Sequence, residues 1–331
     1  MAQLFEKDQI GKREELADYV SLVDSHNTPV SSMARKGSKP GNSIMSWSVT
    51  ALDSVTNTGT VDGTDVSSYD HNTRALCQNY VQIYRLATRV SPLSELSNVA
   101  GVKSELAFQI SQKLVELKRK IELSICSEQD AQADDGSNPY MTKGLGVWIS
   151  ESGGSTLQVP SGFRTPAASI ENDSTTTTST ITDSHIQNVL SSIFSETGTI
   201  TNYACPVGRT LKRAFTDRLT GIRTAADGGS ATDVATQVRT FNPQKGRAVE
   251  MRVDQFVGDF GTLDLLPSNW LPEQTDGFVL NPSDIELRYS SLPSVTTLPN
   301  SGAGEARMIE AIAALVVRSG GLNHGKFDLA S

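Results

Sequence analysis

Apolar and polar residues alternate strictly through residues 43–52, where Met45 and Trp47 fall on one side and serines and a threonine on the other. A period of two is that of a half-buried β-strand. Residues 76–90 carry aromatic and β-branched side chains that favour a second strand. The intervening segment is rich in glycine and turn residues, so residues 41–90 predict an extended two-stranded loop. Because two strands alone are marginal in water, the loop needs a partner surface.

The strongest helical pattern lies between Val102 and Ile125, where large apolar residues recur every three or four positions. This spacing forms a single apolar stripe over about seven turns. We therefore predict a helix at 102–127, roughly 40 Å long at ~1.5 Å per residue. Ser91 followed by Pro92 is typical of a helix start and predicts a short helix before the long one.

The second half of the chain alternates shorter helical and strand patterns, which favours an α+β fold. No period of 20–50 residues repeats, which argues against a solenoid or propeller. Residues 172–182 are polar, with four consecutive threonines, and predict a linker. Helices are expected at 186–193, ending at Gly198, and from Pro206 to Gly221, strands at 200–204, 249–257, 260–266 and 285–289, and a helix or strand at 308–317.

Composition narrows the protein class without naming a function. The 331 residues include 39 serines and 31 threonines, are 37% hydrophobic and 20% charged, and carry a net charge of −8. Such a chain is too polar for a membrane protein and too rich in aliphatic residues for a disordered one. The acidic balance argues against wrapping DNA by bulk charge. The first residues lack a signal sequence and the longest apolar run is 312–317, so we expect folding in a cytoplasm and no membrane partner.

No pattern in the sequence indicates a catalytic centre. The cysteines Cys77, Cys126 and Cys205 are odd in number and widely spaced, which favours free thiols in a reducing compartment. The four histidines show no metal-ligand spacing, and phosphate-binding and nucleophile motifs are absent from the sequence. We therefore expect no enzyme, no metal and no cofactor. A solvated or partner-facing acidic tip is favoured over a cation site for the loop aspartates, Asp53, Asp62, Asp65 and Asp70.

Charge is segregated along the chain. Residues 41–73 and 165–208 contain no lysine or arginine. The segment 209–223, by contrast, is basic and contains a single acidic residue, Asp217. Such segregation suits head-to-tail contact between copies, although an ordinary solvated basic face is the simpler alternative. Nucleic-acid recognition is disfavoured because no aromatic residues interleave the basic ones, which are Arg209, Lys212, Arg213, Arg218 and Arg223.

Four stretches of the sequence carry a resemblance when they are taken in order. They are 77–84 leading into Val90-Ser91, 104–109 with 116–122, 144–149, and 258–261 with Leu271-Pro272. From about residue 40 to the C-terminus, this set resembles the major capsid proteins of tailed bacteriophages with the HK97-type fold. Each stretch is weak alone, but their order and spacing make the set specific. Two local departures are Ser91-Pro92-Leu93 in place of a Ser-Gly-Thr turn, and Ser268-Asn269-Trp270 before Leu271-Pro272. The loop also shows no lysine that matches a cross-linking position.

The resemblance implies an HK97-like α+β fold whose parts fit the patterns above. The long helix 102–127 would be the spine helix of a peripheral domain, and the second half an axial domain. The implied divisions are an N-terminal arm at 1–40, an extended loop at 41–90, a peripheral domain at 91–181, an axial domain at 182–285, and a segment at 286–331 that returns to the peripheral domain.

The function implied is a major capsid protein that assembles through pentamers and hexamers into the icosahedral head around double-stranded DNA. Its partners would be copies of itself, a portal protein, packaged DNA bound without sequence specificity, and a scaffold or decoration protein. The loop would reach a neighbour and bury Met45 and Trp47 there or pair an open strand edge. Its location would be the virion, after assembly in the host cytoplasm. A phage adhesin or tail protein is the alternative, and a hydrolase with a site built from distant residues is a third possibility.

Overall fold

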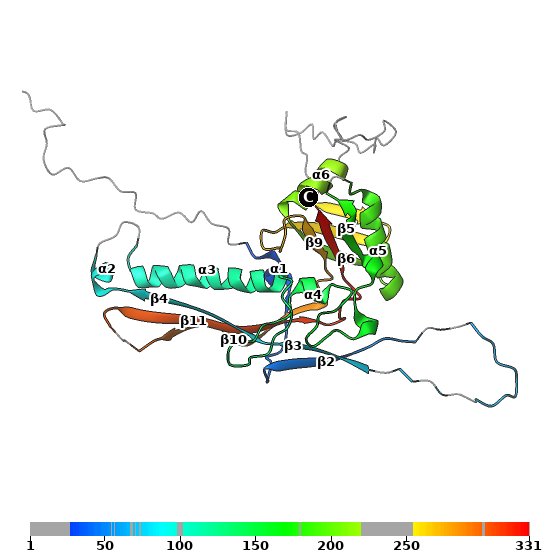
Figure 1. The fold of residues 1–331 in the computed structure, drawn as a ribbon, viewed down its shortest axis with the longest axis horizontal. Coiled ribbons are helices and arrows are strands. Elements are labelled where there is room, and N and C mark those ends of the chain that lie inside the picture. The colour runs from blue at the N-terminus through cyan, green and yellow to red at the C-terminus, as the bar shows by residue number, and fades with distance from the viewer. Residues whose placement is uncertain are drawn as a thin grey trace, which may run out of the picture.

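A computed structural model describes residues 27–330 except 54, 56, 67–68, 70, 73, 98–101, 179, 220–253 and 300–301. The first 26 residues, most of the expected N-terminal arm, lie outside this range. The described chain forms a long helix-on-sheet layer, a two-stranded loop that projects from it, and a second body around a larger sheet (Figure 1).

The first layer packs a long helix along a four-stranded sheet. Helix α3 (Glu105–Cys126) confirms the expected long helix, and α2 (Pro92–Leu96) the shorter one before it. The Ser91 side chain caps α2 by accepting from the Ser94 amide. The sheet order is β1–β10–β11–β4, with β1 (Arg35–Lys36), β10 (Ile285–Thr297), β11 (Glu305–Val317) and β4 (Gln82–Val90).

Burial along α3 is uneven. Leu117, Ile121 and Ile125 are at most 2% exposed and belong to the core shared with the sheet. Each such side chain contributes about 1.5–3 kcal/mol by leaving water. The short helices α1 (Pro29–Met33) and α4 (Leu145–Trp148) pack against the same helix. The apolar stripe read from the sequence therefore does face the core, most completely near the C-terminal end of α3.

The two-stranded loop has the expected antiparallel form but is shorter than the expected 41–90, because residues 82–90 form β4 of the four-stranded sheet. Strands β2 (Ile44–Thr50) and β3 (Arg74–Tyr80) pair in register from Ile44 with Tyr80 to Thr50 with Arg74. Residues beyond these strands continue outward, so the loop end stands far from the rest of the chain (Figure 1).

The second body is a six-stranded sheet covered by two helices, α5 (Asp183–Thr197) and α6 (Arg209–Leu219). Its core contains apolar side chains from both helices and from four of the strands. Two 3-10 helices, η2 (Ser161–Phe163) and η3 (Ala167–Ser169), precede the sheet. Its strands run in the order β5 (Ile170–Thr177), β12 (Gly325–Ala330), β9 (Asp276–Val279), β6 (Thr201–Val207), β8 (Gly261–Pro267), β7 (Gln255–Gly258).

Three local expectations differ from the structure. The stretch 172–182 was expected to be a linker, but β5 occupies most of it, since β-branched threonines suit a strand once β12 pairs beside them. The helix expected from Pro206 begins at Arg209, because Pro206 and Val207 complete β6. The C-terminal segment divides: β11 returns to the first layer, whereas β12 joins the six-stranded sheet.

Candidate subunit-contact surfaces

The root of the loop is packed into its own subunit. Met45 is 6% exposed and lies with Val81, Ala314 and Val316 in a small core cluster. The ring of Trp47 lies 5.5 Å from that of Trp148 at 36°, a tilted aromatic contact. Both residues were expected to be covered by a neighbouring copy. The structure buries Met45 within its own chain instead, whereas Trp47 stays partly exposed and lines the groove described below.

Outside these strands, the loop exposes apolar side chains that sequence reasoning missed. They are isolated in a polar, turn-rich segment, so no periodic pattern marks them. Because five of them lie on one projecting segment, they are candidates for contact with another molecule. The residues concerned, all 69–96% exposed, are Leu52, Val55, Val61, Val66 and Tyr69.

The end of the loop is a tight acidic turn. The Thr64 amide donates to the Val61 carbonyl at 3.3 Å, and Gly63 has a φ of +81°, which glycine adopts without strain. Asp62 and Asp65 are fully solvent-facing, as is Asp53 further back along the loop. The acidic tip expected from the sequence is thus present in these three residues, while Asp70 lies outside the described residues.

The basic segment forms helix α6 as an amphipathic element. Leu211 and Phe215 are buried in the core of the six-stranded sheet, whereas Arg209 and Arg213 are exposed. Lys212 is partly covered, and its Nζ lies 3.5 Å from the Asp254 carboxylate. The expected grouping of cations on one helix side is present for these three, since burial of the apolar side fixes which way they face. Arg218 lies in α6, where its side chain is not described, and Arg223 lies outside the described residues.

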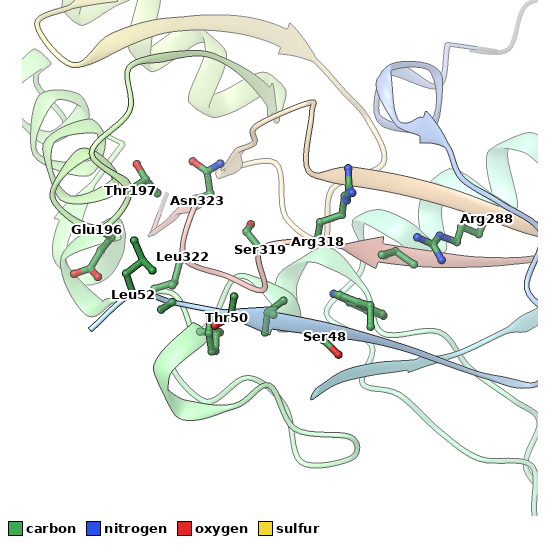
Figure 2. A pocket seen from close by; sticks show the side chains of 15 residues that line it. Ser48, Thr50, Leu52, Glu196, Thr197, Arg288, Arg318, Ser319, Leu322 and Asn323 are labelled. Carbon is green, nitrogen blue, oxygen red and sulfur yellow. The ribbon is translucent and has the colours of Figure 1, made fainter. Parts of the chain in front are cut away.

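A groove of about 700 Å³ opens beside the loop root (Figure 2). One wall is β2 and the residues that follow it, from Trp47 to Leu52. The opposite wall comes from the turn between β11 and β12, and α5 contributes its last residues, Glu196 and Thr197. Arg288 and Arg318 stand at one end of this groove and Glu196 at the other (Figure 2).

Two buried charged groups anchor the segments around the loop root and the arm. Burial lowers the pKa of Lys143, whose Nζ donates to the Gly153 and Leu157 carbonyls at 3.0 and 2.9 Å. The same Nζ lies 3.7 Å from Asp130, which favours the charged form. Burial also raises the pKa of Glu122, whose carboxylate accepts from two amides at the start of α1. These contacts are structural, because neither side chain opens to solvent.

The described residues contain neither a candidate metal-ion site nor a helix that could span a membrane. No group of three or more histidine, cysteine or acidic side chains there could hold a metal ion. Among the helices described, none is long and apolar enough to cross a membrane.

The family model of the SU10 major capsid protein matches residues 3–330, nearly the whole chain. The chain belongs to the SU10 major capsid protein family. The major capsid protein of Escherichia phage Phieco32 is 32% identical over 136 residues, which are 41% of this chain. That alignment spans 38% of the relative's own length.

Solved structures agree on the fold. The capsid of cyanophage P-SCSP1u matches with a TM-score of 0.57 and 12% identity over 96% of this chain and 92% of that chain. The major capsid protein of phage G, solved with its gp26 decoration protein, matches with a TM-score of 0.54 and 10% identity, all of both chains being covered. At such identities the likeness shows the fold alone.

Family membership confirms the capsid fold and the head-shell function expected from the sequence, and places the protein in a virion. The family is one of structural proteins. The adhesin or tail alternative finds no support.

Proposed function

We propose that copies of this chain associate head to tail into rings of five and six, which close the icosahedral head around double-stranded DNA. The observation that carries the proposal is the projecting loop, where five apolar side chains beyond β2 and β3 are 69–96% exposed within the single chain. A loop that reaches beyond its own subunit makes a heterologous contact, and such contacts generate rings when the rotation closes. Each contact can be weak because several hold every subunit at once.

The parts of the chain take the roles that the capsid family suggests. In this proposal residues 1–40 are an arm, 41–80 the loop that reaches a neighbour, and 182–285 the axial domain that gathers at the ring centre. The peripheral domain takes 91–181 together with β4 and β11. Strands β5 and β12 lie before and after residues 182–285 in the sequence, and both join the sheet of the axial domain.

Charge supplies the second proposed contact. The cations of α6, Arg209, Lys212 and Arg213, would face the stretch 165–208 of the next copy, which has no lysine or arginine. Opposite charges across an interface steer encounter and fix the order of subunits more than they raise affinity. We expect assembly to depend on salt, since charges at a surface are screened within about 10 Å at 0.1 M salt.

Further partners follow from the same proposal. A portal protein and a scaffold or decoration protein would contact the shell, and packaged DNA would be enclosed without sequence recognition. The net charge of −8 keeps the shell from gripping DNA by bulk attraction. Three free, buried cysteines fit assembly in the reducing host cytoplasm.

Deletion of residues 53–70 tests the loop contact. We expect a folded chain with unchanged far-UV circular dichroism that no longer forms particles in the electron microscope or megadalton species in sedimentation. Intact particles after this deletion would remove the loop from the mechanism.

Charge reversal tests the second contact. We expect Arg209→Glu, Lys212→Glu and Arg213→Glu together to lower particle yield and to flatten its dependence on salt. The matched control reverses three exposed lysines elsewhere, Lys39, Lys118 and Lys120. Equal behaviour of the two triple variants would show that total charge, rather than α6, governs assembly.

A further inference from the structure

The groove beside the loop root has the features of a peptide-binding site. Strand β2, which forms one wall, pairs only with β3 among the described strands, so its other edge offers backbone groups to an added segment. Apolar side chains of Trp47, Phe163 and Leu322 line the interior. Its volume of about 700 Å³ lies within the range of pockets that enclose a ligand.

The arginine end of the groove favours an acidic occupant. Arg288 lies 2.8 Å from Glu286, and Arg318 lies 3.5 Å from the other oxygen of the same carboxylate. Two guanidinium groups thus share one buried carboxylate, which leaves one positive charge in excess. The Arg318 side chain is 53% exposed and can meet an incoming carboxylate. Glu196 lies at the other end of the groove and repels negative charge, so we expect the carboxylates of the occupant to lie beside the arginines (Figure 2).

The loop tip fits this description. Its turn presents two aspartates, Asp62 and Asp65, next to the exposed apolar Val61 and Val66. Lysine and arginine are absent from residues 41–73, so nothing in the loop repels the groove's arginines. The tip projects away from the groove of its own chain, which leaves that groove open to another copy (Figure 1).

We propose that the groove formed by β2, the turn between β11 and β12 and the end of α5 receives the acidic loop tip of a second copy. The inference rests on the proposed function, because it needs neighbouring copies. Donor and receptor lie at opposite ends of the same loop. Each copy therefore gives its tip to one neighbour and receives a tip from the other, which is the head-to-tail arrangement that a closed ring needs.

Cross-linking in assembled particles tests the contact. Ala51 lines the groove and Asp62 lies in the turn, and both are exposed. The variant with Ala51→Cys and Asp62→Cys is assembled, treated with a short bismaleimide, and separated under denaturing conditions. We expect a ladder that ends at five and six linked chains. The native cysteines are buried and do not compete. The matched control pairs Ala51→Cys with Ser137→Cys, on an exposed loop elsewhere, and should remain mostly monomeric.

The outcomes separate the two levels of the proposal. Normal particles without a ladder, or links only within one chain, would overturn the docking site while leaving shell assembly intact. If the unmodified protein forms no particles under any condition, the proposed function fails first and takes the docking site with it.

A charge exchange gives an independent readout. We expect Arg318→Glu to raise the protein concentration needed for assembly about two- to fivefold, which is the value of one exposed ion pair. Adding Asp62→Arg and Asp65→Arg in the same chain should restore assembly. The control Arg85→Glu removes an exposed ion pair outside the groove and should leave the threshold unchanged. Failure of the exchange to restore assembly, with the fold intact, counts against this contact.

Discussion

The attachment of α1 to α3 depends on one buried carboxylate, and we expect the removal of this carboxylate to release α1. Glu122 is 0% exposed and accepts from the Val30 amide at 2.8 Å and the Ser31 amide at 2.7 Å. These two donors belong to the first turn of α1, where helical partners are absent. Because α1 has five residues, it cannot hold its conformation without such contacts.

The size of the effect follows from the two bonds. A hydrogen bond to a charged group contributes about 1.5–3 kcal/mol, so Glu122→Ala removes about 3–6 kcal/mol from the free energy of opening α1. Part of this loss is offset, because the alanine variant no longer has to bury a carboxylate. The cost of that burial is what raises the pKa of Glu122 in the wild type. We therefore expect a net loss of about 3 kcal/mol, equivalent to roughly a hundredfold faster amide exchange.

Hydrogen–deuterium exchange with mass spectrometry measures this directly on peptides that span residues 28–34. Glu122→Gln keeps one acceptor oxygen and should fall between the wild type and Glu122→Ala. Leu123→Ala is the matched control, because that side chain is exposed and leaves the clamp intact. Exchange of α1 within twofold of the wild type in Glu122→Ala would refute the reasoning, since it would show that other contacts hold the segment.

Three further predictions use other parts of the structure. Burial raises the pKa of Asp276 to about 6, so the folded chain favours the protonated side chain and loses this stabilisation as pH rises from about 4 to 6. The melting temperature should therefore fall less between pH 4.5 and 7 in Asp276→Asn than in the wild type. A Cβ at Gly208 would lie 2.2 Å from the Gln274 carbonyl oxygen, so Gly208→Ala should lower stability by about 1–3 kcal/mol in denaturant titrations, unlike Gly162→Ala, whose Cβ meets nothing. Burial raises the pKa of Cys77 to about 11, so it should resist maleimide at pH 7 until the chain unfolds, as mass spectrometry would show.

The elements that the sequence predicted well are those with local signals. Alternation at 43–52 and the apolar stripe at 102–127 became β2 and α3, because burial of one side imposes those periods. Gly198 ends α5 in the left-handed conformation, as a C-terminal glycine signals. The acidic and basic character of the loop tip and of α6 could likewise be read directly from residue types.

Which residues cover each apolar side chain could be learned only from the fold. The alternating pattern placed Met45 and Trp47 on one side of a strand but could not say whose residues would cover that side. Val61 and Val66 have no periodic signal in the sequence, and only the structure shows that they are exposed. The residues expected to contact a neighbour therefore lie at the tip of the loop rather than at its root. The groove also escaped prediction, because Trp47, Arg288 and Leu322 are brought together only by the packing of distant segments.

The local elements, the segregation of charge and the capsid family therefore follow from the residues alone. That residues 308–317 are a strand depends on the fold, because β10 and β4 offer pairing on both sides. The tertiary structure also decided that Glu122 binds amides 91 and 92 residues away, and that β5 and β12 pair despite their separation along the chain. The physical reason is the range of each interaction: periodicity and capping act over a few residues, whereas pairing and burial depend on which distant segments offer complementary surface.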